Sequence, residues 1–143
     1  MTEQFKRNGA SRNEKPRHTP MTDVDGRMVP RDTDLEQTVL GAIMLERDAY
    51  TSVCDIIKPE SFYDPAHQKI YSAVQQLGMR QQPIDMLTVT EQLRLDGNLE
   101  AAGGPVYIAQ LTSRVLSGAN VEYHARIVAQ KYLARELINF ASS

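Results

Sequence analysis

The chain has 143 residues with a formal net charge of -2, and 41% of them are apolar, a composition typical of one soluble globular domain with a real core. No stretch approaches the roughly 18 consecutive apolar residues of a membrane span, and no apolar run follows the N-terminal basic residues as a secretory signal requires. A single cysteine excludes an internal disulfide framework and a multi-cysteine zinc site.

Residues 1–30 differ in composition from the rest of the chain. They are polar and show no apolar periodicity, so they cannot bury enough surface to offset the entropy of ordering. We predict a disordered arm. Its first twenty residues carry five Lys or Arg against two Glu, whereas residues 21–143 carry eleven against sixteen acids. The basic tip is either a tether for DNA or an acidic partner, or a solvating tail, which is the interpretation we favour.

Three predicted helices follow this arm. The first starts at Asp32 or Thr33, either of which can cap it. A short second helix opens at Asp48 and stops at Lys58-Pro59, because a residue before proline is pushed out of the helical region. The third begins at Asp64-Pro65, an N-cap followed by proline at the first helical position. Apolar residues at helical spacing mark the buried side of the first helix: Leu35, Val39, Leu40, Ile43 and Met44.

Three more helices are predicted in the second half of the chain. One starts at Asp85 or at Thr88 and ends at Asp96-Gly97, where glycine can adopt the left-handed C-cap. The next covers roughly residues 105–116. The last is capped by Asn120 and runs to near residue 140, and the connection between these two is short enough to make them antiparallel neighbours.

The predicted fold is all-α, because no alternating β pattern of useful length and no internal repeat occurs. Residues 1–30 form the arm. Residues 31–101 form a globular helical head of about four short helices. Residues 102–143 form an antiparallel helical hairpin with a long last helix.

The long last helix is apolar on several sides. About 20 residues at 1.5 Å rise span roughly 30 Å, which is longer than its partner helix covers. A helix that is apolar on several sides must be buried on several sides, so the hairpin is expected to meet a second protein surface. The alternative is a helix packed centrally within its own domain.

No catalytic, cofactor-binding or metal-binding constellation is recognisable. The phosphate-binding pattern G-x-x-x-x-G-K-[ST], the dinucleotide pattern G-x-G-x-x-G and the zinc pattern H-E-x-x-H are all absent. The histidines His18, His67 and His124 lack a second ligand at helical spacing. His67 is within reach of Asp64, which favours a role at the helix start. Cys54 lies among apolar residues and is interpreted as a buried, inert thiol.

Six short motifs occur in order along the chain. They are Leu35-Glu36-Gln37-Thr38-Val39-Leu40-Gly41-Ala42-Ile43, Lys58-Pro59-Glu60-Ser61-Phe62-Tyr63, Ala66-His67-Gln68-Lys69-Ile70-Tyr71, Pro83-Ile84-Asp85-Met86-Leu87-Thr88-Val89, Gly103-Gly104 with Tyr107-Ile108-Ala109-Gln110-Leu111, and Ala119-Asn120-Val121-Glu122-Tyr123-His124-Ala125-Arg126-Ile127-Val128. In this order and spacing they resemble the N-terminal domain of DnaB-type bacterial replicative DNA helicases. His124 stands where that family usually has Tyr, and the chain stops where family members continue into a linker helix and an ATPase domain.

The resemblance implies a scaffold domain of a hexameric replicative helicase, without ATPase or unwinding activity of its own. Hairpins of neighbouring subunits would pair, giving a trimer of dimers in the parent hexamer. The domain would also receive the C-terminal domain of primase, and a helicase loader is an additional candidate partner. ATP and Mg are expected only in the missing C-terminal domain. DNA is expected to bind only weakly to this chain, and no contact with a membrane is expected. The expected location is cytoplasmic, at the nucleoid near replication forks.

Residue assignments follow from the same resemblance. The expected subunit-pairing residues are Val106, Leu111, Val115, Leu116, Val121, Ile127 and Val128. The expected primase-binding residues are Asp34, Tyr107 and Ile138, of which the last two could instead be hairpin core. The alternative functions are a stand-alone helical regulatory or nucleic-acid-binding domain, which needs a clustered basic face, and an enzyme, which needs a convergent polar pocket.

Overall fold

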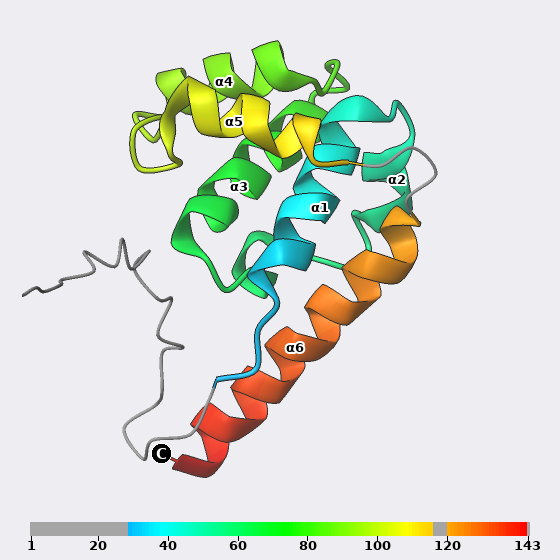
Figure 1. Ribbon diagram of the computed structural model, residues 1–143, viewed down its shortest axis with the longest axis vertical. Coiled ribbons are helices and arrows are strands. Elements are labelled where there is room, and N and C mark those ends of the chain that lie inside the picture. The colour runs from blue at the N-terminus through cyan, green and yellow to red at the C-terminus, as the bar shows by residue number, and fades with distance from the viewer. Residues whose placement is uncertain (1–28, 116–119, 143) are drawn as a thin grey trace, which may run out of the picture.

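The computed structural model describes residues 29–115 and 120–142, and every regular element in these ranges is helical (Figure 1). In chain order the elements are α1 (Thr33–Leu45), α2 (Ala49–Val53), the 3-10 turn η1 (Pro59–Ser61), α3 (Pro65–Met79), α4 (Met86–Leu95), α5 (Gly104–Ser113) and α6 (Val121–Ser142). The all-α prediction is confirmed. Residues 1–28 of the predicted arm lie outside the described residues. None of the described helices combines the length and apolarity needed to cross a membrane.

Side-chain caps start four of the helices. Asp32, Asp64, Asp85 and Asn120 each accept a hydrogen bond from a backbone N–H in the first turn, at 2.8 to 3.1 Å. These caps satisfy donors that have no partner within the helix. Of the predicted alternatives, Asp32 and Asp85 are the caps. The Thr88 hydroxyl oxygen accepts a hydrogen bond from the Asp85 backbone N–H at 2.9 Å, which completes a reciprocal capping box.

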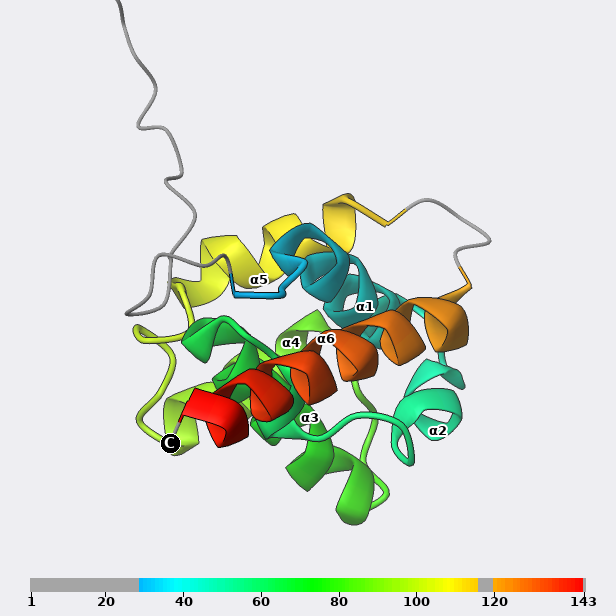
Figure 2. The same cartoon turned by 90° about the horizontal axis from the view of Figure 1, so that it is seen from below.

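Helix α1 is the central helix of the domain. It packs against α2, α3, α5 and α6, and both views place it between α5 and α6 (Figure 1, Figure 2). Its residues Val39, Leu40 and Ile43 are at most 1% exposed. They belong to one hydrophobic core to which all six α-helices contribute, so the packing of α1 sets the positions of the helices around it.

The last two helices do not form the predicted hairpin. α5 packs on α1 and α4, whereas α6 packs on α1, α2 and η1. Both therefore contact the helices expected to form the head, with α1 between them (Figure 2). The short connection limits the distance between the end of α5 and the start of α6, but it does not oblige the two helices to lie along each other.

Among the described residues, the rest of the domain covers one face of helix α6. Val121, Ala125 and Val128 are buried. On another face, Leu133, Leu137 and Phe140 are 60%, 70% and 83% exposed, at a spacing of four and three residues. This part of α6 extends beyond the other helices (Figure 1). The domain thus leaves much of the apolar surface of its long helix uncovered, as the sequence indicated, while the second surface that would cover it stays a prediction.

Two helical glycines mark close approaches. A Cβ on Gly41 of α1 would lie 2.2 Å from the backbone oxygen of Leu111 in α5. A Cβ on Gly78 of α3 would lie 2.2 Å from the ring of Tyr50, which is only half-buried and can rotate away. The close approach of α5 to α1 therefore requires glycine at position 41. The packing of α3 depends much less on glycine at position 78.

We expect Gly41→Ala to lower the free energy of unfolding by about 1 to 3 kcal/mol, because the added methyl group collides with backbone and the helices must separate. Gly78→Ala is the matched control, since both substitutions gain about 1 kcal/mol of helix propensity and only Gly41 faces a rigid obstacle. Urea unfolding followed by circular dichroism measures both changes. Equal stabilities of the two variants would contradict the close α1–α5 contact.

The side chain of Tyr71 is completely buried at the centre of the domain. Its hydroxyl donates a hydrogen bond to the Ile57 carbonyl at 3.1 Å, and its ring lies 5.2 Å from that of Phe62. Burial raises the pKa of Tyr71 well above its usual value. The folded domain therefore holds this proton at a pH at which an exposed tyrosine has lost it.

Tyr71→Phe is expected to change how stability depends on alkaline pH. Below about pH 10 the wild-type chain should be more stable by about 1 kcal/mol, the contribution of one buried hydrogen bond. Above about pH 10, the unfolded chain releases the Tyr71 proton and the folded chain does not, so the wild-type free energy of unfolding falls as pH rises. The free energy of unfolding of the variant should fall less steeply with pH, which urea titrations below and above this pH measure. Parallel curves would contradict the raised pKa.

Candidate partner-binding groove

A groove of about 890 Å³ opens between the start of α1, the start of α3 and α5. It brings together two of the residues that the sequence predicted for primase binding, Asp34 of α1 and Tyr107 of α5. Its rim carries both signs of charge. The charged residues that line it are Arg31, Asp34, Asp64, Glu100 and Arg114.

Tyr107 is held on one wall of this groove. Its hydroxyl lies 2.6 Å from Nε2 of His67, and the two rings are stacked, with centroids 6.0 Å apart and an interplanar angle of 6°. Gly103 has a φ of +101° and a Cβ there would lie 2.8 Å from the Tyr107 side chain, so glycine provides both the turn and the space for the ring. Burial, followed by the negative charge of Asp64, raises the pKa of Tyr107 above its usual value.

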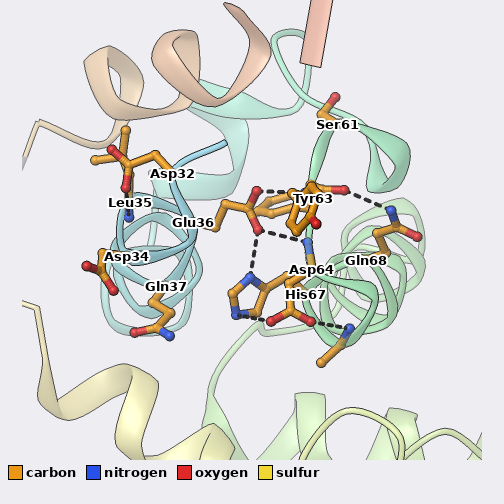
Figure 3. Close-up of polar contacts among 12 residues, drawn as sticks. Asp32, Asp34, Leu35, Glu36, Gln37, Ser61, Tyr63, Asp64, His67 and Gln68 are labelled. Carbon is orange, nitrogen blue, oxygen red and sulfur yellow. Dashed lines mark hydrogen bonds and ion pairs between the residues drawn. The ribbon is translucent and has the colours of Figure 1, made fainter. Parts of the chain in front are cut away.

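Nδ1 of His67, the ring nitrogen that does not face Tyr107, contacts a buried carboxylate that accepts three hydrogen bonds (Figure 3). Glu36 is 2% exposed. Its oxygens accept from the backbone N–H of Tyr63 at 2.7 Å, from that of Asp64 at 3.3 Å and from Nδ1 of His67 at 2.8 Å. His67 is itself completely buried. The contacts are those of a structural network, and the described residues contain no group of three or more His, Cys, Asp or Glu side chains that could hold a metal ion.

The sequence pattern did not identify this pair. It placed His67 beside Asp64, and Nε2 of His67 does lie 3.9 Å from Asp64, but its shorter contacts are with Glu36 and Tyr107. A usable signal was present. Glu36 lies on the same helical face as Val39 and Leu40, three and four residues later, and an acid on a buried apolar face requires hydrogen-bond donors from elsewhere in the chain.

Ile138, the third residue predicted for primase, lies in a different hollow of about 380 Å³ beside α6. Tyr63 lines both hollows. In the smaller one, the buried guanidinium of Arg135 donates to the carbonyls of Pro30 at 2.8 Å and Ser61 at 2.9 Å. Burial lowers the pKa of Arg135. Asp34 and Tyr107 therefore line one groove. Ile138 lines a neighbouring hollow, in which the Arg135 side chain is already hydrogen-bonded to the domain's own backbone.

The predicted subunit-pairing residues do not form one surface. Leu111, Val121 and Val128 are buried in the core of their own domain, so they cannot face a second molecule in this fold. They are buried because α5 and α6 each pack on α1. The remaining members are Val106, which is 70% exposed, Val115 and Ile127, which are half-buried, and Leu116, which lies outside the described residues.

Known proteins are similar in sequence to this chain. Residues 28–130 match the family described as the DnaB-like helicase N terminal domain. The chain is similar to the replicative DNA helicase DnaB of Rhodothermus marinus, with 50% identity over 110 residues that cover 77% of this chain and 12% of that protein. It is also 41% identical over 124 residues to the replicative DNA helicase DnaC of Bacillus subtilis (strain 168), covering 86% of this chain and 27% of that protein. The chain thus spans about a quarter or less of the length of these two relatives.

Solved structures share the fold. The crystal structure of the N-terminal domain of DnaB helicase from Mycobacterium tuberculosis matches with a TM-score of 0.77 and 40% identity, over 80% of this chain and 83% of that one. The structure of a DnaB-like replicative helicase and its interactions with primase matches with a TM-score of 0.69 and 27% identity, over 78% of this chain and 26% of that one. Sequence and fold agree, and the chain belongs to the family of DnaB-like helicase N-terminal domains.

Proposed function

We propose that this domain is the scaffold of a replicative DNA helicase and that its groove binds the C-terminal domain of primase. The observation that carries the proposal is the meeting of Asp34 and Tyr107 in one open groove. One solved relative is described together with its interactions with primase. ATP hydrolysis and unwinding are functions we propose for the longer protein that contains such a domain, with ATP and Mg bound outside this chain.

The chemistry of the groove suits a protein partner. Tyrosine supplies a large, rigid contact area with few rotatable bonds and is enriched among residues that dominate binding energy. The charged rim, with arginines and acids side by side, favours orientation of a partner that carries complementary charges. A helical segment with one apolar anchor and a polar border fits this arrangement.

Tyr107→Ala should weaken binding of the cognate primase C-terminal domain by about ten-fold or more, since truncating a central aromatic anchor typically costs more than 1 kcal/mol. Isothermal titration calorimetry gives the affinity, and circular dichroism checks that helicity is retained. Tyr123→Ala is the matched control, because Tyr123 is 58% exposed on α6 and does not line the groove. Ile138→Ala should have a smaller effect. Unchanged affinity of Tyr107→Ala would remove the groove as the primase site.

Subunit pairing is the second part of the proposed scaffold role. We propose that the apolar stripe of α6, consisting of Leu133, Leu137 and Phe140, forms the contact with a second copy, in place of the buried residues first assigned to it. Large apolar side chains exposed together on one helix face are typical of interaction surfaces. The relatives are described as replicative helicases, and the expected assembly of the parent protein is a hexamer built as a trimer of dimers.

The pairing proposal predicts self-association that charges on the stripe abolish. Sedimentation velocity across a concentration series should show dimer formation by the wild-type chain and a monomer for the double variant Leu133→Glu, Leu137→Glu. The control is Leu87→Glu, Leu95→Glu on α4, because those leucines are 75% and 72% exposed and lie outside the stripe. A control pair that dissociates the dimer equally, or a wild-type chain that stays monomeric, would count against the stripe.

A further inference from the structure

Three side chains from three helices form a continuous chain of hydrogen bonds from the core to the groove. Glu36 comes from α1, His67 from α3 and Tyr107 from α5. Glu36 and His67 are 2% and 0% exposed, so neither is available to a partner. Tyr107 lines the groove and is the one member of the chain that a partner can reach.

The directions of these hydrogen bonds follow from the chemistry of the groups. The Glu36 carboxylate already accepts from two backbone N–H groups, and a carboxylate oxygen cannot donate. The hydrogen between Glu36 and His67 therefore sits on Nδ1 of the ring. When the ring is neutral, the other nitrogen, Nε2, is an acceptor, so the hydrogen-bond chain inferred here has the Tyr107 hydroxyl donating to it. Glu36 thus selects the tautomer of His67, and the tautomer selects the direction in which the hydroxyl points.

The packing around Tyr107 holds its ring in one orientation. The ring is stacked on His67, its hydroxyl lies within hydrogen-bond distance of Nε2 of that residue, and it fills space that a side chain at Gly103 would need. A side chain that is already fixed in its bound orientation loses less conformational entropy when a partner binds. Buried groups that hold such a side chain therefore contribute to affinity without touching the partner.

We propose that Glu36 and His67 are positioning residues for partner binding, which hold Tyr107 in the orientation that the partner of the groove recognises. The inference rests on the proposed function in one respect, that Tyr107 contacts primase. It adds that the affinity of the groove depends on a buried hydrogen-bond chain between α1, α3 and α5. A merely structural role of the pair would affect stability and affinity in parallel, and the variants below separate the two.

The first measurement needs no partner. Nitrogen-15 NMR of the imidazole ring should show His67 as the tautomer with hydrogen on Nδ1. In Tyr107→Phe, the Nε2 resonance should shift because its donor is lost, while Nδ1 should keep its bond to Glu36. A ring with its hydrogen on Nε2, a ring protonated on both nitrogens, or an Nε2 resonance that is insensitive to Tyr107→Phe would overturn the hydrogen-bond chain whatever the groove binds.

The second measurement compares two amide substitutions of the same histidine by titration with the primase C-terminal domain. The amide of His67→Asn lies near the position of Nδ1 and keeps a donor for Glu36, but it is too short to reach Tyr107. The amide of His67→Gln lies near the position of Nε2 and keeps an acceptor for Tyr107, but it loses the bond to Glu36. We expect His67→Asn to bind about two- to ten-fold more weakly, the effect of one hydrogen bond, and His67→Gln to retain more affinity although it is the less stable variant.

A double-mutant cycle completes the test. If His67 acts through the Tyr107 hydroxyl, the double variant His67→Asn, Tyr107→Phe should bind no more weakly than the weaker single variant. Two results would overturn the positioning role and leave the primase site in place. One is that the losses of affinity in the two single variants add up in the double variant. The other is that His67→Asn binds with wild-type affinity while Tyr107→Ala clearly binds more weakly. Wild-type affinity of Tyr107→Ala would instead reject the primase site, and with it any role of the pair in binding there.

Discussion

The buried carboxylate of Glu36 is the interaction on which the groove depends. A charge taken out of water is tolerated only where donors replace its hydration, and Glu36 finds two of them in the backbone of Tyr63 and Asp64 and a third in His67. These donors lie at the start of α3, so one side chain of α1 fixes the position of the helix that forms the next wall. Through His67 the same side chain reaches Tyr107 on the third wall.

A close backbone contact also fixes the position of a wall of the groove. Gly41, one turn and a half along α1 from Glu36, lets the carbonyl of Leu111 approach α1 closely. α5 is thus held to α1 at Gly41 and to α3 through the His67–Tyr107 contact. The groove is open to solvent, yet all three of its walls are set by groups inside the domain. A site built in this way keeps its shape before any partner arrives, which lowers the cost of binding.

Local interactions could be predicted from the sequence, and interactions between distant residues could not. The caps at Asp32, Asp64 and Asp85 connect residues two or three positions apart, so the spacing alone indicates them. The Glu36–His67 bond joins residues 31 positions apart, and only the acid on the buried face of α1 indicated that a donor was needed. Asp34 and Tyr107 were expected in one site from family resemblance, and the packing of α5 on α1 brings them together.

The prediction of a hairpin failed for a related reason, and the failure changes which residues are available for pairing. A short connection indicates how near two helix ends lie, whereas the contact between helices depends on which faces fit. α5 fits against α1 at Gly41, and α6 fits against α1 through Val121, Ala125 and Val128. Because the described part of the domain occupies that face of α6, a second molecule would meet the other face, on which Leu133 and Leu137 are exposed. Arg135 anchors α6 between these residues through two backbone carbonyls, so a partner would meet a helix that is already held in place.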